Sequence, residues 1–287
     1  MQLLMATTTD LAPADFLAAH SQLFAEFDEN TQDSGNISYG VHAGLRSFFV
    51  KTAGTANGSK AYLSHPDRVA LLRNAVAISR AVSHPALVPL RNVIESPTGP
   101  LLVYDWVNGE LIGTVQSRRS DPASAFARFR RLSQSRRFAA LDVIFDLHDK
   151  LADKGWIAAD FYDSSLLYNF DTHVLHVIDL DNYHAGPCIN QMGRMFGSTR
   201  FMAPEELELH ACIDQSSTVF TLGRCVLEFL FGGSTNSGEF AGSLAFFELA
   251  RRACQPEPAQ RFANVAQFCN AWRAARRNQP SSATVSS

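Results

Sequence analysis

Strand-type and helix-type patterns occupy different parts of this sequence, and this separation constrains the fold more than any other feature. Residues 35–54 begin and end with glycine and are rich in β-forming residues at their centre, which predicts a hairpin that turns near Gly44. Two more strands are predicted at 87–94 and 100–106, joined by a Ser-Pro-Thr-Gly turn. The apolar spacing over 66–84 predicts one amphipathic helix between the two strand pairs.

Helical patterns surround this strand-rich region. We expect a leading helix over 12–29 and, in the second part of the chain, a long amphipathic helix over 136–154. Two short strands near 166–169 and 174–179 interrupt the helices, which then resume. Strands with one main helix, followed by helices with a small hairpin, predict an α+β protein in two lobes and not a doubly wound sheet.

The length of 287 residues fits two packed lobes, and a hydrophobic share of 46% allows each a core. We expect a β-rich N-terminal lobe at 1–107 and a mostly helical C-terminal lobe at 108–277. The last residues, 278–287, are small and polar and predict a flexible tail.

Composition and charge exclude several classes of protein. A net charge of −3 does not suit a protein that coats nucleic acid, and no recognition motif for nucleic acid is present. None of the five cysteines forms a C-x-x-C pair, which favours reduced thiols over a disulfide framework or a zinc site. With no signal peptide and no apolar run of about 18 residues, we expect a cytoplasmic protein without a membrane segment.

Residues suited to phosphoryl transfer follow one another along the chain. A glycine-containing turn carries Gly35 and Gly40, and Lys51 ends the strand that follows it. Asp160 lies in a loop after the long amphipathic helix, and Asp179 follows a short strand. In this chemistry, backbone amides and a lysine hold the phosphates, one aspartate binds Mg²⁺ and a second orients the attacking hydroxyl.

Six segments match the motifs of one family in their order. They are 49–51 for the end of V-A-I-K, 154–160 for the approach to H-R-D, 177–181 for D-F-G, 197–205 for G-T-x-x-Y-x-A-P-E, 219–223 for V-W-S-L-G and 258–262 for D-P-x-x-R. On these segments the chain resembles the protein-kinase family, specifically the bacterial relatives of serine/threonine kinases. The resemblance covers residues 35–272.

The resemblance implies a bilobal kinase-like fold and an ATP-dependent phosphotransferase that uses Mg²⁺ or Mn²⁺, most simply a serine/threonine protein kinase. Lys51 would contact the α- and β-phosphates beneath the turn of Gly35 and Gly40. Asp160 would orient the substrate hydroxyl, and Asp179 would bind the metal ion.

Other positions follow from the same resemblance. The strand that carries Asp105 and Val107 resembles the hinge, whose backbone would bond the adenine edge. Ser198 stands where the family has a threonine that bridges to the catalytic aspartate. Glu205 and Arg261 match a buried ion pair beneath the substrate-binding segment, a structural role that says little about activity.

The sequence also departs from the family's pattern. Ala75 stands where the family's helix has the glutamate that pairs with the lysine. Ser165 replaces the metal-binding asparagine, and Asp163 is a candidate to compensate with a harder oxygen ligand. Thr218 replaces the aspartate that opens the V-W-S-L-G helix, and alanines replace the His-Arg pair at 158–159.

These departures keep two alternatives open. One is a pseudokinase, which would bind nucleotide or partners without turnover because Ala75 and Ser165 lack the usual chemistry. The other is a small-molecule kinase, although such kinases usually lack the segment that 197–205 resembles. The phosphorylated substrate itself is not identified by the sequence.

Seven arginines lie between residues 118 and 137. They fit either a solvated helical face or a basic patch that attracts an acidic protein substrate or partner.

Overall fold

The computed structural model describes residues 2–28, 34–55, 62–233 and 244–279 of a mixed α+β protein. The chain divides into two compact units, residues 1–109 and 110–287. The division expected from the sequence lies after residue 107. Most of the expected tail at 278–287 falls outside the described residues. No helix in the described ranges combines the length and apolar character that crossing a bilayer requires.

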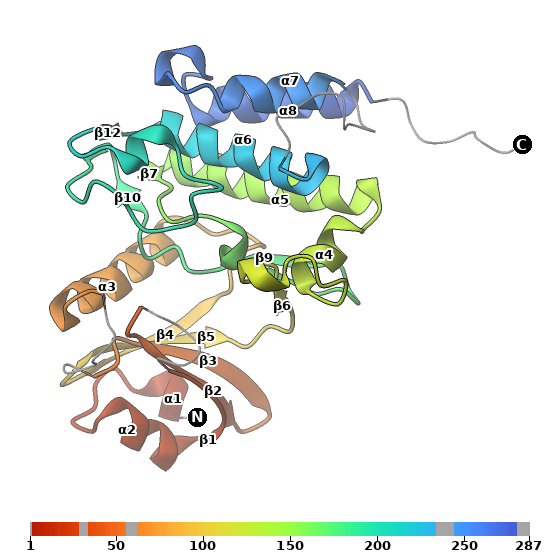
Figure 1. The fold of residues 1–287 in the computed structure, drawn as a ribbon. Helices are drawn as coiled ribbons and strands as arrows, with labels where there is room; N and C mark the ends of the chain where they lie inside the picture. Colours follow the sequence, from red (N-terminus) through yellow and green to blue (C-terminus); the bar gives the residue numbers. More distant parts are fainter. Residues whose placement is uncertain (1, 29–33, 56–61, 234–243, 280–287) are drawn as a thin grey trace, which may run out of the picture. The chain divides into compact units, whose positions relative to one another are not determined.

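The first unit is built on a five-stranded antiparallel sheet (Figure 1). Along the chain its strands are β1 (Gln22–Phe27), β2 (Ile37–Ala43), β3 (Arg46–Thr52), β4 (Leu90–Ser96) and β5 (Gly99–Asp105). Across the sheet their order is β1-β2-β3-β5-β4. The predicted hairpins are present: β2 and β3 turn at Gly44, whose φ of +66° suits glycine, and Ser96 pairs with Gly99 between β4 and β5.

Helices pack on both faces of this sheet. They are α1 (Gln2–Met5), α2 (Pro13–His20) and α3 (His65–Ala81). Successive strand residues point to opposite faces, and β5 shows the alternation. Its Leu101 and Val103 share a core cluster with Phe16 of α2, whereas Leu102 packs in another cluster with Leu72 of α3. The main helix predicted over 66–84 is α3, which begins after the N-cap residue Ser64.

The prediction of a leading helix over 12–29 is wrong for the second half of that range. Helix α2 ends at His20, and Ser21 adopts an extended backbone while its hydroxyl donates to the Leu17 carbonyl oxygen at 2.6 Å. Residues 22–27 then form strand β1, which pairs with β2. Phe24 stacks on His42 of β2 with ring centroids 4.3 Å apart. Cross-strand packing therefore overrides a spacing of apolar residues that also suits a helix.

The second unit is mostly helical. Its α-helices are α4 (Ala125–Arg130), α5 (Gln134–Asp153), α6 (Gln215–Phe231), α7 (Leu244–Ala253) and α8 (Val265–Arg277). Short 3₁₀ turns lie at Gln116–Arg118, Asp163–Ser165, Pro204–Leu207 and Pro258–Gln260. An aromatic cluster joins α5, α7 and α8: the Trp272 ring lies 4.9 Å from those of Phe145 and Phe246, measured between centroids.

In the described part of this unit, three small sheets accompany the helices. Their strands are β6 (Glu110–Leu111), β7 (Trp156–Ile157), β8 (Leu166–Tyr168), β9 (Leu175–Val177), β10 (His184–Ala185), β11 (Cys188–Ile189) and β12 (Cys212–Ile213). The β8–β9 hairpin confirms the two short strands predicted near 166–169 and 174–179. Strand β10 pairs with β7, and this pairing connects the chain after Asp179 to the chain before Asp160.

Candidate active site

Asp160 and Asp179 both adopt a left-handed backbone, with φ of 58° and 63°. Asp160 follows helix α5 and strand β7, and Asp179 follows strand β9. Aspartate is one of the few residues other than glycine that visits this conformation routinely. Asp160 is half-buried, Asp179 is exposed, and neither residue belongs to a helix or a strand.

A hydrogen bond joins these two loops. The side-chain amide of Asn182, in the turn after Asp179, donates to Oδ2 of Asp160 at 2.8 Å. The turn is closed by the Tyr183 backbone N–H, which donates to the Leu180 carbonyl oxygen at 3.1 Å. Asn182 therefore holds the Asp160 carboxylate against the segment that carries Asp179.

The loop of Asp160 is also held by contacts with helices α5 and α6. The backbone N–H of Ala158 donates to Oγ1 of Thr218 in helix α6 at 3.0 Å, and both residues are buried. The sequence departs from the kinase motif at Thr218, and the threonine hydroxyl still supplies an acceptor to this loop. Phe161 packs on His148 of α5 with ring centroids 4.4 Å apart. His148 is itself buried.

Gly197 brings the segment 197–205 against Asp160. Its φ is +114°, and a Cβ atom added there would lie 3.3 Å from Oδ1 of Asp160. A side chain at this position would therefore crowd the carboxylate as well as strain the backbone. Ser198 follows directly, and its carbonyl oxygen accepts a hydrogen bond from the Phe201 N–H at 2.8 Å.

Asp163 has an arginine partner in the structure. It is 1% exposed, and its carboxylate forms an ion pair with Arg200 of the 197–205 segment. Burial raises the pKa of Asp163, and the nearby guanidinium groups of Arg200 and Arg119 act against that rise. Ser165, the other residue considered for a second metal ligand, is also buried. Within the described ranges, no group of three or more His, Cys, Asp or Glu side chains could hold a metal ion.

Arg200 also belongs to a larger network of ion pairs. Its Nη1 donates to Oε2 of Glu228 at 3.0 Å, and Nη2 of Arg224 donates to Oε1 of the same carboxylate at 3.0 Å. These residues, with Asp163, come from three separate segments of the chain. This network could not be predicted, because nothing in the sequence indicates that residues so far apart meet.

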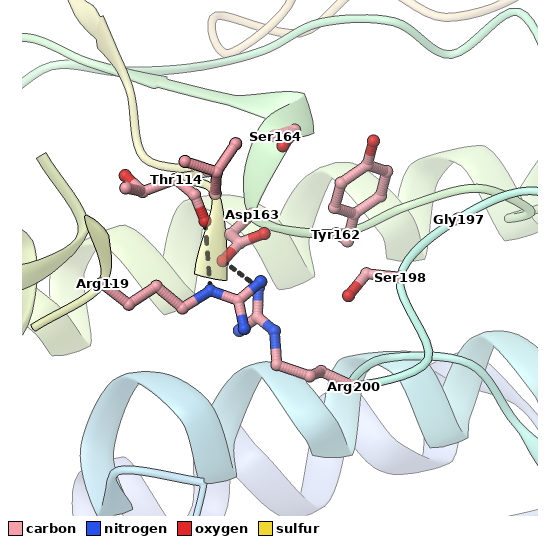
Figure 2. Close-up of a pocket in the computed structure, with 10 residues that line it drawn as sticks. Thr114, Arg119, Tyr162, Asp163, Ser164, Gly197, Ser198 and Arg200 are labelled. Carbon is pink, nitrogen blue, oxygen red and sulfur yellow. Dashed lines mark hydrogen bonds and ion pairs between the residues drawn. The ribbon is translucent and has the colours of Figure 1, made fainter. Parts of the chain in front are cut away.

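Figure 2 shows a pocket beside this network. It has a volume of about 280 Å³ and is lined by Gly113, Thr114, Val115, Arg119, Tyr162, Asp163, Ser164, Gly197, Ser198 and Arg200. Gly113 is essential to its shape, because a Cβ atom there would lie 2.0 Å from Oγ of Ser164. The pocket thus includes Ser198 and touches the segment that contacts Asp160.

The ion pair expected between Glu205 and Arg261 is present and buried. Nη1 and Nη2 of Arg261 donate to the two carboxylate oxygens of Glu205 at 2.6 and 2.9 Å. Arg261 also donates to the carbonyl oxygens of Ser216 and Pro256, at 3.0 and 2.7 Å. The pair therefore anchors the end of the 197–205 segment to α6 and to the turn before α8.

The expected residues of the first unit lie on its sheet. Lys51 is half-buried on β3, where it pairs with Ser38 and Leu102. Gly40 is not in a loop as predicted: it lies inside β2, opposite Phe49. A Cβ atom at Gly40 would lie 2.8 Å from the Phe24 ring, so this glycine permits close packing by β1.

Gly35 and the hinge-like strand have their own contacts. Gly35 has a φ of +81°, and its carbonyl oxygen accepts a hydrogen bond from the buried Arg68 of α3. Asp105 ends β5 and forms ion pairs with Arg46 and Arg91 at 2.8 and 2.6 Å. Val107 follows β5 and is half-buried.

Ala75, where the family has its glutamate, is buried on α3 against the sheet. Its position is therefore filled by apolar packing.

No protein-family model matches this chain, and no curated protein matches it significantly.

Proposed function

We propose that this protein is an ATP-dependent phosphotransferase with a bilobal protein-kinase-like fold, acting on serine or threonine of a protein substrate. The observation that carries the proposal is the hydrogen bond from Asn182 to Asp160. It brings together the two loops whose aspartates the chemistry requires, one to orient a hydroxyl and one to bind a metal ion.

The first unit supports the same proposal. The strand that carries Lys51 is followed by one long helix, α3, and then by the β4–β5 hairpin. This is the order that the resemblance to protein kinases implies. In the proposal, Lys51 contacts the α- and β-phosphates of ATP, and the backbone near Asp105 and Val107 bonds the adenine.

Asp179 is the residue that fits a metal ion. Mg²⁺ commonly binds one or two carboxylates and completes its shell with water and substrate phosphates, so one exposed carboxylate is sufficient. The ion would neutralise charge on the transferred phosphoryl group. Asp160, held by Asn182, accepts a hydrogen bond from the substrate hydroxyl and directs its oxygen toward the phosphorus.

The test is nucleotide binding and phosphate transfer measured on the same proteins. ATP with Mg²⁺ at 100 times its dissociation constant should raise the free energy of unfolding by about 2.7 kcal/mol. We expect Lys51→Met and Asp179→Asn to weaken this stabilisation, and Asp160→Asn to keep it while losing transfer of labelled phosphate to a protein mixture. Asp171→Asn, an exposed aspartate in the β8–β9 turn, is the control. No stabilisation by ATP in the wild type would refute the proposal.

Two observations favour a second candidate, a pseudokinase. Asp163 is paired with Arg200, and α3 presents Ala75 where an acid would pair with Lys51. A pseudokinase would be stabilised by ATP, would transfer no phosphate, and would respond equally to ATP in the wild type and in Asp160→Asn. Measurable transfer by the wild type that is lost in Asp160→Asn excludes it.

A further inference from the structure

The pocket of Figure 2 contains two guanidinium groups that act on one carboxylate. Arg119 and Arg200 both line it, and both lower the pKa of Asp163, against the larger effect of burial. In Figure 2 their side chains extend toward Asp163 from different sides. The Asp163 carboxylate therefore interacts with the guanidinium groups of both Arg119 and Arg200.

The charged groups around Asp163 carry more positive than negative charge. The connected groups are the guanidinium groups of Arg119, Arg200 and Arg224 and the carboxylates of Asp163 and Glu228. Three cationic groups and two anionic groups leave one positive charge in excess.

Arg119 has hydrogen-bonding capacity to spare. Its one side-chain hydrogen bond within the described residues runs from Nε to the Thr114 carbonyl oxygen at 3.1 Å. This bond fixes the direction of the side chain and leaves both terminal amino groups for a ligand. Nε of Arg200 is buried and has no hydrogen-bond partner in the described part of the chain.

The walls of the pocket are fixed by the backbone. The Gly113 N–H donates to the Asp163 carbonyl oxygen and the Ile112 N–H to that of Leu166, both at 2.9 Å. Hydroxyl groups of Ser164 and Ser198 line the same space and can donate to an anion. A volume of about 280 Å³ is ample for a carboxylate or phosphate group.

The pocket also adjoins the candidate catalytic aspartate. Gly197 lines it and lies against Asp160, where a Cβ atom would be 3.3 Å from Oδ1. We propose that this pocket binds an anionic group of the substrate peptide, a carboxylate or a phosphate, close to the hydroxyl that receives the phosphoryl group. The inference rests on the proposed function and deepens it, since it makes the protein selective for acidic or already phosphorylated peptides.

Three of the seven arginines between 118 and 137, other than Arg119, have partners within the second unit. Arg118 pairs with Asp121, Arg128 pairs with Glu110, and Arg137 donates to the Phe229 carbonyl oxygen. Of the seven arginines, Arg119 is the one that lines the pocket. Arg118 is therefore a matched control, because it carries the same charge one residue away and is 67% exposed.

The first experiment measures binding alone. Labelled peptides share one sequence in which alanine replaces the acceptor serine, and flanking positions carry Asp, phosphoserine, Asn or Lys in turn. Fluorescence anisotropy gives the dissociation constants. We expect the Asp or phosphoserine peptide to bind at least about tenfold tighter than the Asn peptide, because charge-assisted hydrogen bonds to arginine are strong. Comparison of these two peptides distinguishes a carboxylate from a phosphate.

The variants assign this preference to the pocket. Arg119→Gln should abolish it, Arg119→Lys should retain part of it, and Arg118→Gln should leave it unchanged. Thermal unfolding of each variant confirms that it folds. Equal binding of Asp and Asn peptides by the wild type overturns the inference, as does a preference that survives Arg119→Gln or is lost equally in Arg118→Gln.

The second experiment separates this inference from the proposed function. Serine versions of the peptides are incubated with ATP and Mg²⁺, and kcat/KM is measured. Transfer at equal kcat/KM to neutral and anionic peptides overturns the anion pocket and leaves the phosphotransferase standing. Selective binding of anionic peptides without transfer to any of them overturns the phosphotransferase and leaves the anion pocket standing.

Discussion

The side-chain amide of Asn182 donates a 2.8 Å hydrogen bond to the carboxylate of Asp160, and this contact joins two loops that are separate in the sequence. An amide donor orients the carboxylate, which suits a group that must accept a hydrogen bond from a substrate hydroxyl. The contact makes Asn182 a positioning residue for the proposed reaction.

Replacement of Asn182 should therefore affect turnover more than stability. We expect Asn182→Ala to lower kcat by about 10- to 100-fold, since a hydrogen bond to a charged group contributes about 1.5–3 kcal/mol. The KM for ATP should change little. Asn270→Ala, at an exposed position of α8, is the control. Equal kcat values for the two variants would show that Asn182 does not position Asp160.

The buried pair of Glu205 and Arg261 should be important for stability. Arg261→Ala leaves the Glu205 carboxylate buried without its bidentate partner, which we expect to cost about 3–5 kcal/mol of unfolding free energy. Urea denaturation measures this loss. Arg251→Ala breaks the pair with Glu248, whose side chains are 57% and 47% exposed, and should cost less than about 1 kcal/mol. Similar losses in both variants would contradict the expectation.

Glu206 should give the fold a pH dependence. Burial raises its pKa from the ordinary 4.5 to about 8, with the negative charges of Glu205 and Asp160 adding to the rise. At a pH between these two pKa values, the Glu206 carboxyl has lost its proton in the unfolded chain and retains it in the folded chain. The stability from protonated Glu206 is thus complete below pH 4.5 and is lost as the pH rises to about 8.

Glu206→Gln isolates this effect, because glutamine keeps an oxygen that can accept the Ala203 N–H, bonded at 2.7 Å in the wild type. We expect both proteins to be similarly stable near pH 4.5 and the variant to be more stable by about 2–4 kcal/mol at pH 8. Urea unfolding across this range tests the prediction. Parallel pH profiles for the two proteins would refute it.

Gly40 should be needed because of Phe24. In Gly40→Ala the new methyl group meets the Phe24 ring, 2.8 Å from the position of the added Cβ, so the variant should lose about 1 kcal/mol. In a Phe24→Ala background the same change should cost less, because of the two rings that crowd the added Cβ only that of Trp106, at 3.0 Å, remains, and alanine restricts the unfolded chain more than glycine does. A double-mutant cycle in urea gives the coupling energy. Additive effects would mean that the two residues do not meet.

Much of the local structure could be predicted from the sequence. The hairpin around Gly44, helix α3, helix α5 and the β8–β9 hairpin all follow from hydrophobic period and turn residues, which are local properties. Strand β1 could not be predicted, because Leu23, Phe24 and Phe27 also suit one side of a helix. Pairing with β2 makes this segment a strand and not a helix, and that pairing cannot be read from the sequence.

The candidate site divides in the same way. From the sequence alone, Lys51, Asp160 and Asp179 are candidates for phosphoryl transfer. Their order along the chain and the turn-forming residues near them can be read directly from the sequence. Only the tertiary structure decided that Asn182 holds Asp160, that Arg200 pairs with Asp163, and that Arg119 turns into a pocket. Hydrogen bonds and ion pairs depend on distances of about 3 Å, and those distances exist only after segments far apart in sequence have packed.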